Sequence, residues 1–320
     1  FPRRDPCAQM AADEGPEPAD GADTPEHTPS AADKRLGRMN KPLKETIALY
    51  QTEVDEMLTK LEGILPHAGV VGQQPLRDVW IVRFLVGNHW KVEEAADKFR
   101  QMVAFRDRYK MDDVRAKFED GTMKKEDIPG FKGHFSTCPD TFHLASGDAK
   151  DGSPIVCSRV TKWDFDAYYQ LNEEQEDQFQ YYHMEYMMWR IDKLCIESGM
   201  LRGNVKIIDL NGVSLGQRAV MKQNAAKRRE RYERLGANLE VCYPEMVAKI
   251  NIVNAPSFVA ILWWAAKSFL AQRTIDKTVI VRQQGTQEAL LDMIDASVLP
   301  EVFGGDFKGH WLMSDPPSSG

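Results

Sequence analysis

The feature that most constrains the fold is a change in the spacing of apolar residues along the chain. Between residues 42 and 109, apolar side chains recur at steps of three and four, the period of amphipathic helices. From residue 153 onward they gather in short runs separated by helical stretches. Strands that alternate with helices indicate an α/β layer with a mostly parallel sheet. We therefore expect a helical N-terminal lobe followed by an α/β lobe.

The helical lobe is predicted to hold three helical segments. The first spans residues 42–61, where an apolar stripe ends before Gly63 and Pro66. The second begins near Pro75, and the third runs over residues 92–109. We place the lobe at residues 34–130 and the α/β lobe at residues 131–307.

The α/β lobe is predicted to alternate four strands with four helices. Residues 173–198 form its longest helix, capped by Asn172 with Gln175 three residues on, and Tyr182, Tyr186 and Trp189 mark its buried face. The strands are predicted at 153–157, 205–210, 249–254 and 278–282, and the other helices at 217–240, 258–270 and 287–294.

The two ends of the chain are predicted to be tails. Residues 1–33 hold six prolines and many Ala, Asp and Glu residues without apolar periodicity. Such a segment buries too little surface to offset the entropy of ordering. We expect residues 1–33 to be a disordered, solvated tail, and whether this tail binds a protein partner is left open. Residues 308–320 are expected to form a C-terminal tail.

Charge, cysteines and apolar runs exclude several classes of protein. The net charge of −7 gives no reason to expect nucleic-acid binding. The longest apolar run, residues 258–266, is far shorter than the ~20 residues of a membrane-spanning helix. No signal peptide opens the sequence, and five widely spaced cysteines favour reduced thiols over a disulfide framework or zinc site. We therefore expect a cytoplasmic protein.

Motifs of common enzyme classes are missing from the sequence. There is no phosphate-binding loop, no GxSxG motif and no HExxH motif, and the seven histidines lack ligand spacing. We therefore expect neither catalysis nor a cofactor or metal.

Eight short motifs follow one another in a fixed order. They are Arg83-Phe84-Leu85, Trp90-Lys91-Val92, Phe105-Arg106-Asp107, Ile207-Ile208-Asp209-Leu210-Asn211-Gly212-Val213-Ser214, Tyr243-Pro244-Glu245, Ile252-Val253-Asn254-Ala255-Pro256, Leu299-Pro300 and Phe303-Gly304-Gly305. Together they resemble the CRAL-TRIO family over about residues 76–307, and they are most similar to its secretory-pathway phosphatidylinositol and phosphatidylcholine transfer proteins.

The resemblance implies a helical lobe beside an α/β lobe that encloses an apolar cavity for one lipid. It also implies a mobile helix that gates the entrance. Asp209, which in isolation could serve as a catalytic acid, falls on a structural position of the family.

The predicted gate helix lies at residues 257–270, where apolar residues are nearly continuous. A helix that is apolar on all sides must bury every side or meet lipid. A buried core helix is the alternative that periodicity alone favours, and the family position reverses that preference. The predicted gate residues are Phe258, Ile261, Leu262, Trp263, Trp264 and Phe269.

Thr274 and Lys277 are the predicted contacts to a lipid head group. A buried phosphate needs charge-assisted hydrogen bonds. In isolation, Thr-x-x-Lys before a strand is ordinary loop chemistry; in the resembled subgroup these residues contact the phosphoinositide. Glu245 matches a charged position of the family and either orients nearby basic groups or is a solvated acid.

Three positions near the predicted ligand site depart from the subgroup. A basic pair of the subgroup is replaced by Asn88 and His89, which still offer hydrogen bonds or partial charge without equalling an arginine fork. Ser214 matches a hydroxyl used for phosphatidylcholine, but its partner hydroxyl is replaced by Gly216. These departures weaken the prediction of phosphatidylcholine as a ligand more than that of phosphatidylinositol.

A run of basic residues lies within the predicted helix at 217–240. Most such runs are solvated faces; the functional alternative is docking on anionic membranes. The residues predicted to dock are Lys227, Arg228, Arg229 and Arg231.

The function expected from these features is exchange of single phospholipids, with phosphatidylinositol favoured, during transient contact with membrane surfaces. Two alternatives stay open. One is a carrier of another hydrophobic molecule, such as a sterol, tocopherol or retinoid. The other is a lipid-sensing module that recruits or regulates another protein.

Overall fold

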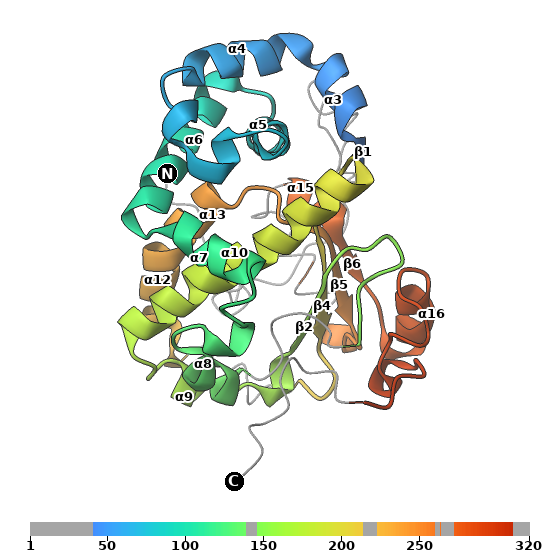
Figure 1. The fold of residues 1–320 in the computed structure, drawn as a ribbon. Helices are drawn as coiled ribbons and strands as arrows, with labels where there is room; N and C mark the ends of the chain where they lie inside the picture. Colours follow the sequence, from blue (N-terminus) through green and yellow to red (C-terminus); the bar gives the residue numbers. More distant parts are fainter. Residues whose placement is uncertain (1–40, 139–145, 214–222, 260–262, 264–271, 310–320) are drawn as a thin grey trace, which may run out of the picture.

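The computed structural model describes residues 41–138, 146–213, 223–259, 263 and 272–309. In these residues, a group of helices lies above one end of a parallel sheet, and one long helix crosses between them (Figure 1). The predicted fold class, α/β with a helical N-terminal lobe, is confirmed. The predicted tail at 1–33 lies outside the described residues.

Helices in the N-terminal lobe follow the predicted apolar stripes, with one break. The segment predicted at 42–61 is divided at Tyr50, whose φ of −119° and ψ of 34° are not helical. The lobe comprises α3 (Leu43–Leu49), α4 (Gln51–Leu61), α5 (Leu76–Gly87), α6 (Val92–Arg108) and α7 (Met111–Glu119), and α8 (Phe131–Thr137) follows it. The spacing did not predict α7 and α8.

A short antiparallel pair ties the start of the lobe to the rest of the chain. Strand β1 (Lys41–Pro42) pairs with β3 (Met200–Leu201), with Lys41 opposite Leu201. No apolar run marks either two-residue strand, so the spacing of apolar residues could not reveal them.

The main sheet has four strands in the order β2-β4-β5-β6, all parallel. Each strand predicted from an apolar run is present, with ends shifted by a few residues. The strands are β2 (Ile155–Arg159), β4 (Asn204–Asp209), β5 (Val247–Val253) and β6 (Thr278–Ile280).

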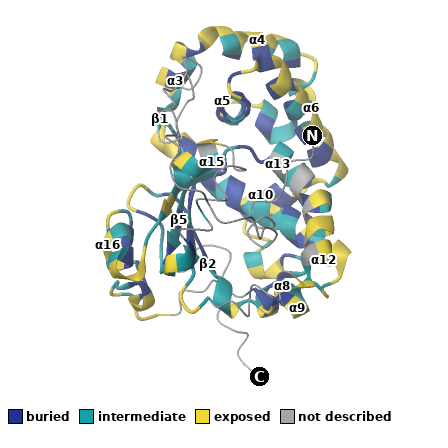
Figure 2. Cartoon of the chain, turned by 180° about the vertical axis from the view of Figure 1, so that it is seen from behind, coloured by how far each residue is buried: buried dark blue, intermediate teal, exposed yellow. Residues whose placement is uncertain are grey.

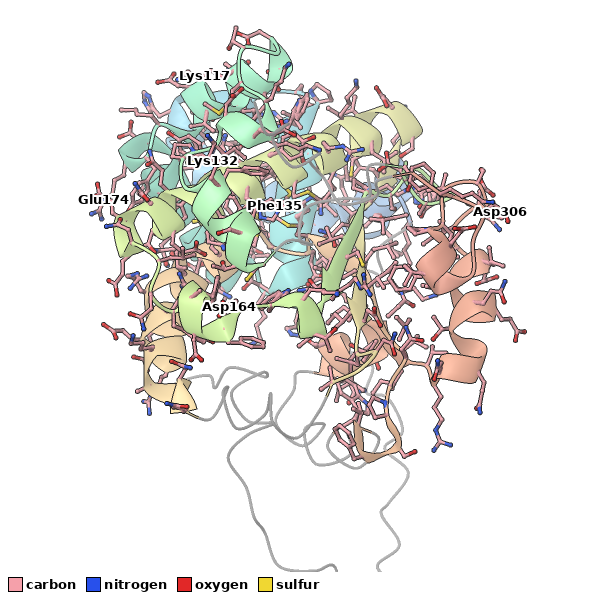
Figure 3. All side chains as sticks on the ribbon, turned by 90° about the horizontal axis from the view of Figure 1, so that it is seen from below. Lys117, Lys132, Phe135, Asp164, Glu174 and Asp306 are labelled. Carbon is pink, nitrogen blue, oxygen red and sulfur yellow. The ribbon has the colours of Figure 1, made fainter. Side chains whose placement is uncertain are left out.

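The two faces of this sheet are covered to different degrees. One face presents Ile155, Ile207 and Val253, all fully buried, to α16 (Thr286–Leu291) and the residues after it. The opposite face carries Ile208, Ile252 and Ile280, which are only partly buried. Seen from below, α8 with Phe135 lies on the side of the sheet opposite α16 (Figure 3).

The long helix α10 (Glu173–Ser198) has the predicted bounds and the predicted cap. The Asn172 side chain accepts a hydrogen bond from the backbone N–H of Gln175 at 3.0 Å. Tyr182, Tyr186 and Trp189, which were predicted to mark its buried face, are half-buried and pack against the larger core. The buried positions include three carboxylates, Glu176, Glu185 and Asp192, because packing covers α10 on more than one side.

The larger hydrophobic core extends across the predicted lobe boundary at residue 130. It joins α5 and α6 to Phe179, Met188 and Ile191 of α10 and to Tyr243. Exposed residues gather on the outer faces of α4 and α12 (Ala225–Arg231), whereas strands β2 and β4 are mostly buried (Figure 2). Tertiary packing therefore joins the helical lobe to α10 in one core.

The predicted charged helix at 217–240 is described only from residue 223. It consists of α12 (Ala225–Arg231), a π-helical turn (Tyr232–Gly236) and α13 (Ala237–Cys242). No helix of the described residues is long and apolar enough to cross a membrane.

Candidate functional site

Glu245 and Lys277 meet because they precede neighbouring parallel strands. Glu245 lies two residues before β5, and Lys277 lies directly before β6. Parallel strands begin at the same edge of a sheet, so both residues lie at its amino edge. Thr274 and Lys277 belong to a short helix, α15 (Gln272–Lys277), rather than to the expected loop. Their spacing of three places them on one side of it.

The Lys277 ammonium forms an ion pair with the Glu245 carboxylate. The Glu245 side chain is 6% exposed and that of Lys277 is 21% exposed. An ammonium has three donors, so Lys277 can hold this carboxylate and still donate to another anion. The pair thus presents a cation whose position is fixed by a buried acid.

The end of α5 approaches the same place. A Cβ atom on Gly87 would lie 3.2 Å from the Pro244 Cβ and 3.7 Å from the Glu245 Cγ, so the backbones pass closely. His89 follows with a left-handed φ of 56° and is exposed. The structure therefore brings the 87–89 turn, Glu245 and α15 together from three distant parts of the sequence.

Asn88 is buried and already engaged within the chain. Its amide nitrogen donates to the Phe84 carbonyl at 2.7 Å, and its oxygen accepts from the Lys98 ammonium at 2.5 Å. These contacts close the end of α5, a role that differs from the predicted contact to an inositol hydroxyl. These two contacts use one N–H and one oxygen lone pair of the Asn88 amide.

The predicted gate is described only in part. Residues 257–259 are helical, and Phe258 and Trp263 are half-buried. Ile261, Leu262, Trp264 and Phe269 lie outside the described residues, as does Ser214. The gate therefore stays a prediction.

A row of isoleucines forms a second part of the candidate site. Ile208, Ile252 and Ile280 are direct neighbours across β4, β5 and β6. They share the sheet face that α16 does not cover. The segment predicted as the gate helix, residues 257–270, follows the carboxyl end of β5 in the sequence. The spacing of apolar residues did not predict this row, because the residues two positions before Ile208 and Ile280 on the same face are Lys206 and Thr278.

The predicted membrane-docking residues face in different directions. Lys227 and Arg229 are exposed, and Arg229 pairs with Glu233 along the helix. Arg231 instead turns inward: its guanidinium lies 4.0 Å from the centre of the Tyr168 ring and 3.6 Å from Glu176. The prediction of an outward-facing Arg231 does not fit this packing, because a buried carboxylate attracts it. The side chain of Arg228 is not described.

A buried charge network that sequence reasoning missed joins the helical lobe to α10. The Glu185 carboxylate accepts from Arg106 at 2.7 Å and pairs with Arg115 at 3.6 Å. Asp192 accepts from Arg115 at 2.8 Å and from the Trp80 indole at 3.0 Å. Burial alone would raise the pKa of Glu185, but Arg106 and Arg115 outweigh it, so the pKa is lowered. The carboxylate is thus held charged inside the protein.

Asp209, at the end of β4, is enclosed by structural partners. It accepts from the Asn254 side chain at 2.7 Å, from the Asn211 backbone at 2.9 Å and from Arg159 at 3.3 Å. Its carboxylate thus holds the strand ends together. Within the described ranges, no group of three or more His, Cys, Asp or Glu side chains has the arrangement of a metal site.

Comparison with known families agrees with this architecture. Residues 143–305 match the model of the CRAL/TRIO domain, and the chain belongs to that family. The crystal structure of Sfh5 has the same fold, with a TM-score of 0.56 and 15% identity over 82% of this chain and 89% of that chain.

Several named relatives match most of the chain at low identity. The phosphatidylinositol/phosphatidylcholine transfer protein SFH11 of Arabidopsis thaliana is 28% identical over 87% of this chain and 70% of its own length. The SEC14 cytosolic factor of Eremothecium gossypii is 25% identical over 82% of each chain. The match to SFH7 of Arabidopsis thaliana is 28% identical over 73% of this chain but spans only 41% of SFH7.

Proposed function

We propose that this chain binds one phospholipid at a time, with phosphatidylinositol favoured, and exchanges it between membranes without a chemical step. The observation that carries the proposal is the Lys277–Glu245 pair beside Thr274, at the amino edge of a sheet with one partly covered face. The names of SFH11 and SFH7 as phosphatidylinositol/phosphatidylcholine transfer proteins support it.

The head group would meet the chain at α15. A lipid phosphate requires charge-assisted hydrogen bonds once water is removed. In this proposal Lys277 donates a hydrogen bond to the phosphate while it keeps its ion pair with Glu245, and the Thr274 hydroxyl adds a second donor. Asn88, His89 and Ser214 stay secondary candidates for contacts to the head group.

The acyl chains would lie against the partly covered sheet face. Each buried CH₂ group contributes about 0.8 kcal/mol, so the chains supply most of the affinity and the head group supplies the selection. The row formed by Ile208, Ile252 and Ile280 is the surface we assign to them. The segment at 257–270 would open this face when the protein meets a bilayer.

Membrane contact would be peripheral and transient, and the protein cytoplasmic. Lys227 and Arg229 are exposed, and each basic residue near an anionic surface contributes about 1 kcal/mol. These residues, rather than Arg231, are the ones we expect to dock.

Native mass spectrometry after incubation with vesicles of defined composition tests the proposal. Vesicles of phosphatidylcholine with a minor share of phosphatidylinositol should yield a one-to-one complex enriched in phosphatidylinositol. Transfer to acceptor vesicles should follow. Lys277→Ala should lower phosphatidylinositol loading by about tenfold, the effect of losing a charge-assisted hydrogen bond.

Lys308→Ala is the matched control, since Lys308 is 80% exposed and lies in a different part of the fold. A copurified sterol, tocopherol or retinoid in place of phospholipid would favour the other carrier class. Loading without transfer would favour a lipid-sensing module. Equal phosphatidylinositol loading by wild type and Lys277→Ala would exclude Lys277 as a contact to the head group.

A further inference from the structure

The backbone at Glu245 is held in a conformation that a glutamate rarely adopts. Its φ is 52°, in the left-handed region, which costs a residue with a Cβ about 1–3 kcal/mol. Such a conformation persists only where surrounding contacts determine it. Two sets of contacts bracket this turn, one on each side of Pro244.

The first contact is a buried arginine of the helical lobe. Arg83 of α5 is fully buried, and its Nη1 donates to the Glu245 carbonyl at 2.9 Å. Its Nη2 donates to the Arg202 carbonyl at 2.6 Å and to the Cys195 Sγ at 3.3 Å. No carboxylate within the described ranges pairs with Arg83. The Arg83 guanidinium therefore binds backbone carbonyls of two residues that precede β5 and β4.

The second contact comes from the tyrosine of the same turn. The Tyr243 hydroxyl donates to the Glu185 carboxylate of α10 at 3.0 Å. Glu185 is itself fixed by Arg106, so Tyr243 is attached to a rigid buried network. Burial is the main cause that raises the pKa of Tyr243 well above its usual value, and the hydroxyl stays a donor.

We propose that Arg83 and Tyr243 are positioning residues, which hold the 243–245 turn so that the Glu245 carboxylate faces Lys277. This inference rests on the proposed phosphatidylinositol site and adds to it a mechanism of preorganisation. If either contact is removed, Glu245 relaxes toward negative φ, which moves its side chain away from Lys277. The ammonium then loses its fixed position, and the head group binds a less ordered site.

A double-mutant cycle separates positioning from general destabilisation. The four proteins are wild type, Tyr243→Phe, Glu245→Gln and the double variant, and the readout is the apparent dissociation constant for phosphatidylinositol vesicles. We expect a loss of about tenfold for Glu245→Gln and about fivefold for Tyr243→Phe. Because Tyr243 acts through Glu245, the double variant should lose about tenfold rather than the product.

Tyr181→Phe is the matched control. Tyr181 is also buried in the larger core, and its hydroxyl bonds Asn238 rather than the turn. It should leave phosphatidylinositol binding unchanged. Arg83→Met should weaken phosphatidylinositol binding as much as Glu245→Gln does. Arg83→Lys should bind with an affinity between those of wild type and Arg83→Met, because an ammonium reaches only some of the acceptors that the guanidinium contacts.

Multiplicative losses in the cycle, or an unchanged Tyr243→Phe, would overturn the inference while leaving the proposed function intact. Failure of wild type to load phosphatidylinositol would overturn both. If Arg83→Met does not fold, the Tyr243 cycle decides alone, since Tyr243→Phe removes one hydroxyl and preserves the packing.

Discussion

At the scale of single residues, burial decides charge. His183 on α10 is half-buried with its Nε2 shielded from solvent, and this desolvation, together with His134 and Lys206, lowers its pKa from 6.5 to about 3. The imidazole is therefore neutral throughout the range in which an exposed histidine changes charge.

Replacing His183 by Gln should change how stability depends on pH. Between pH 6.5 and about 3, His183 is protonated in the unfolded chain but stays neutral in the folded protein. The contribution to stability is thus complete above pH 6.5 and falls as pH drops. Wild type should lose about 1 kcal/mol per pH unit more than His183→Gln between pH 6 and 5.

Urea unfolding at pH 7, 6 and 5 measures this difference. His67→Gln, which removes a histidine from the surface, is the control. Parallel pH profiles for wild type and His183→Gln would contradict a neutral His183 in the folded protein.

At the scale of elements, helices are joined by charge as well as by apolar packing. The Arg106–Glu185–Arg115–Asp192 network connects α6 and α7 to α10, and all four side chains are at most 4% exposed. Buried ions are costly unless every one is paired. The network therefore fixes which faces of these helices meet.

Glu185→Ala should destabilise the protein strongly, because Arg106 and Arg115 would stay buried without their shared partner. We expect a loss of about 3–5 kcal/mol in the free energy of unfolding, measured by urea titration. Glu233→Ala removes an exposed glutamate that pairs with Arg229 and should have no measurable effect. A loss no larger than that control would show that the network contributes little.

Adjacent residues of β4 should respond differently to the same enlargement. Ile208→Trp fills the partly covered face and should lower phospholipid loading by about tenfold with little change in stability. Ile207→Trp enters the face sealed by α16 and should cost about 1–3 kcal/mol or more through overpacking. Native mass spectrometry and urea unfolding measure the two effects. Undiminished loading by Ile208→Trp would remove this face from the lipid site.

At the scale of the whole molecule, α15, which carries Thr274 and Lys277, lies where the helical lobe meets the sheet (Figure 1). Arg83 comes from α5, Glu245 precedes β5, and Lys277 ends α15. The lobe thus contributes to the candidate site through the backbone contacts of one buried arginine, besides covering α10.

Exchange between vesicles should depend on the segment at 257–270. Replacing Trp263 and Trp264 by Ala removes side chains that favour the membrane interface. We expect exchange about tenfold slower, the effect of about 1.4 kcal/mol, with lipid loading retained. Leu49→Ala, which changes an exposed apolar residue on α3, is the control. Unchanged exchange by a folded double variant would exclude this segment as the gate.

The sequence by itself determined what depends on local spacing. Apolar periodicity located α5, α6, α10 and the four strands, and the Asn172 cap fixed where α10 begins. Ordered motifs indicated the family, and the resemblance pointed to Glu245, Thr274 and Lys277 as candidates for the lipid site. Periodicity and capping act over a few residues, so a linear sequence carries them in full.

Only the tertiary structure decided which distant groups meet. Lys277 pairs with a residue 32 positions earlier, and Arg83 bonds a carbonyl 162 positions later. Nor does spacing along α10 show that Glu185 and Asp192 are buried, because their burial depends on arginines from α6 and α7. The Lys277–Glu245 ion pair exists because parallel strands start at one edge, a property of the assembled sheet rather than of either segment.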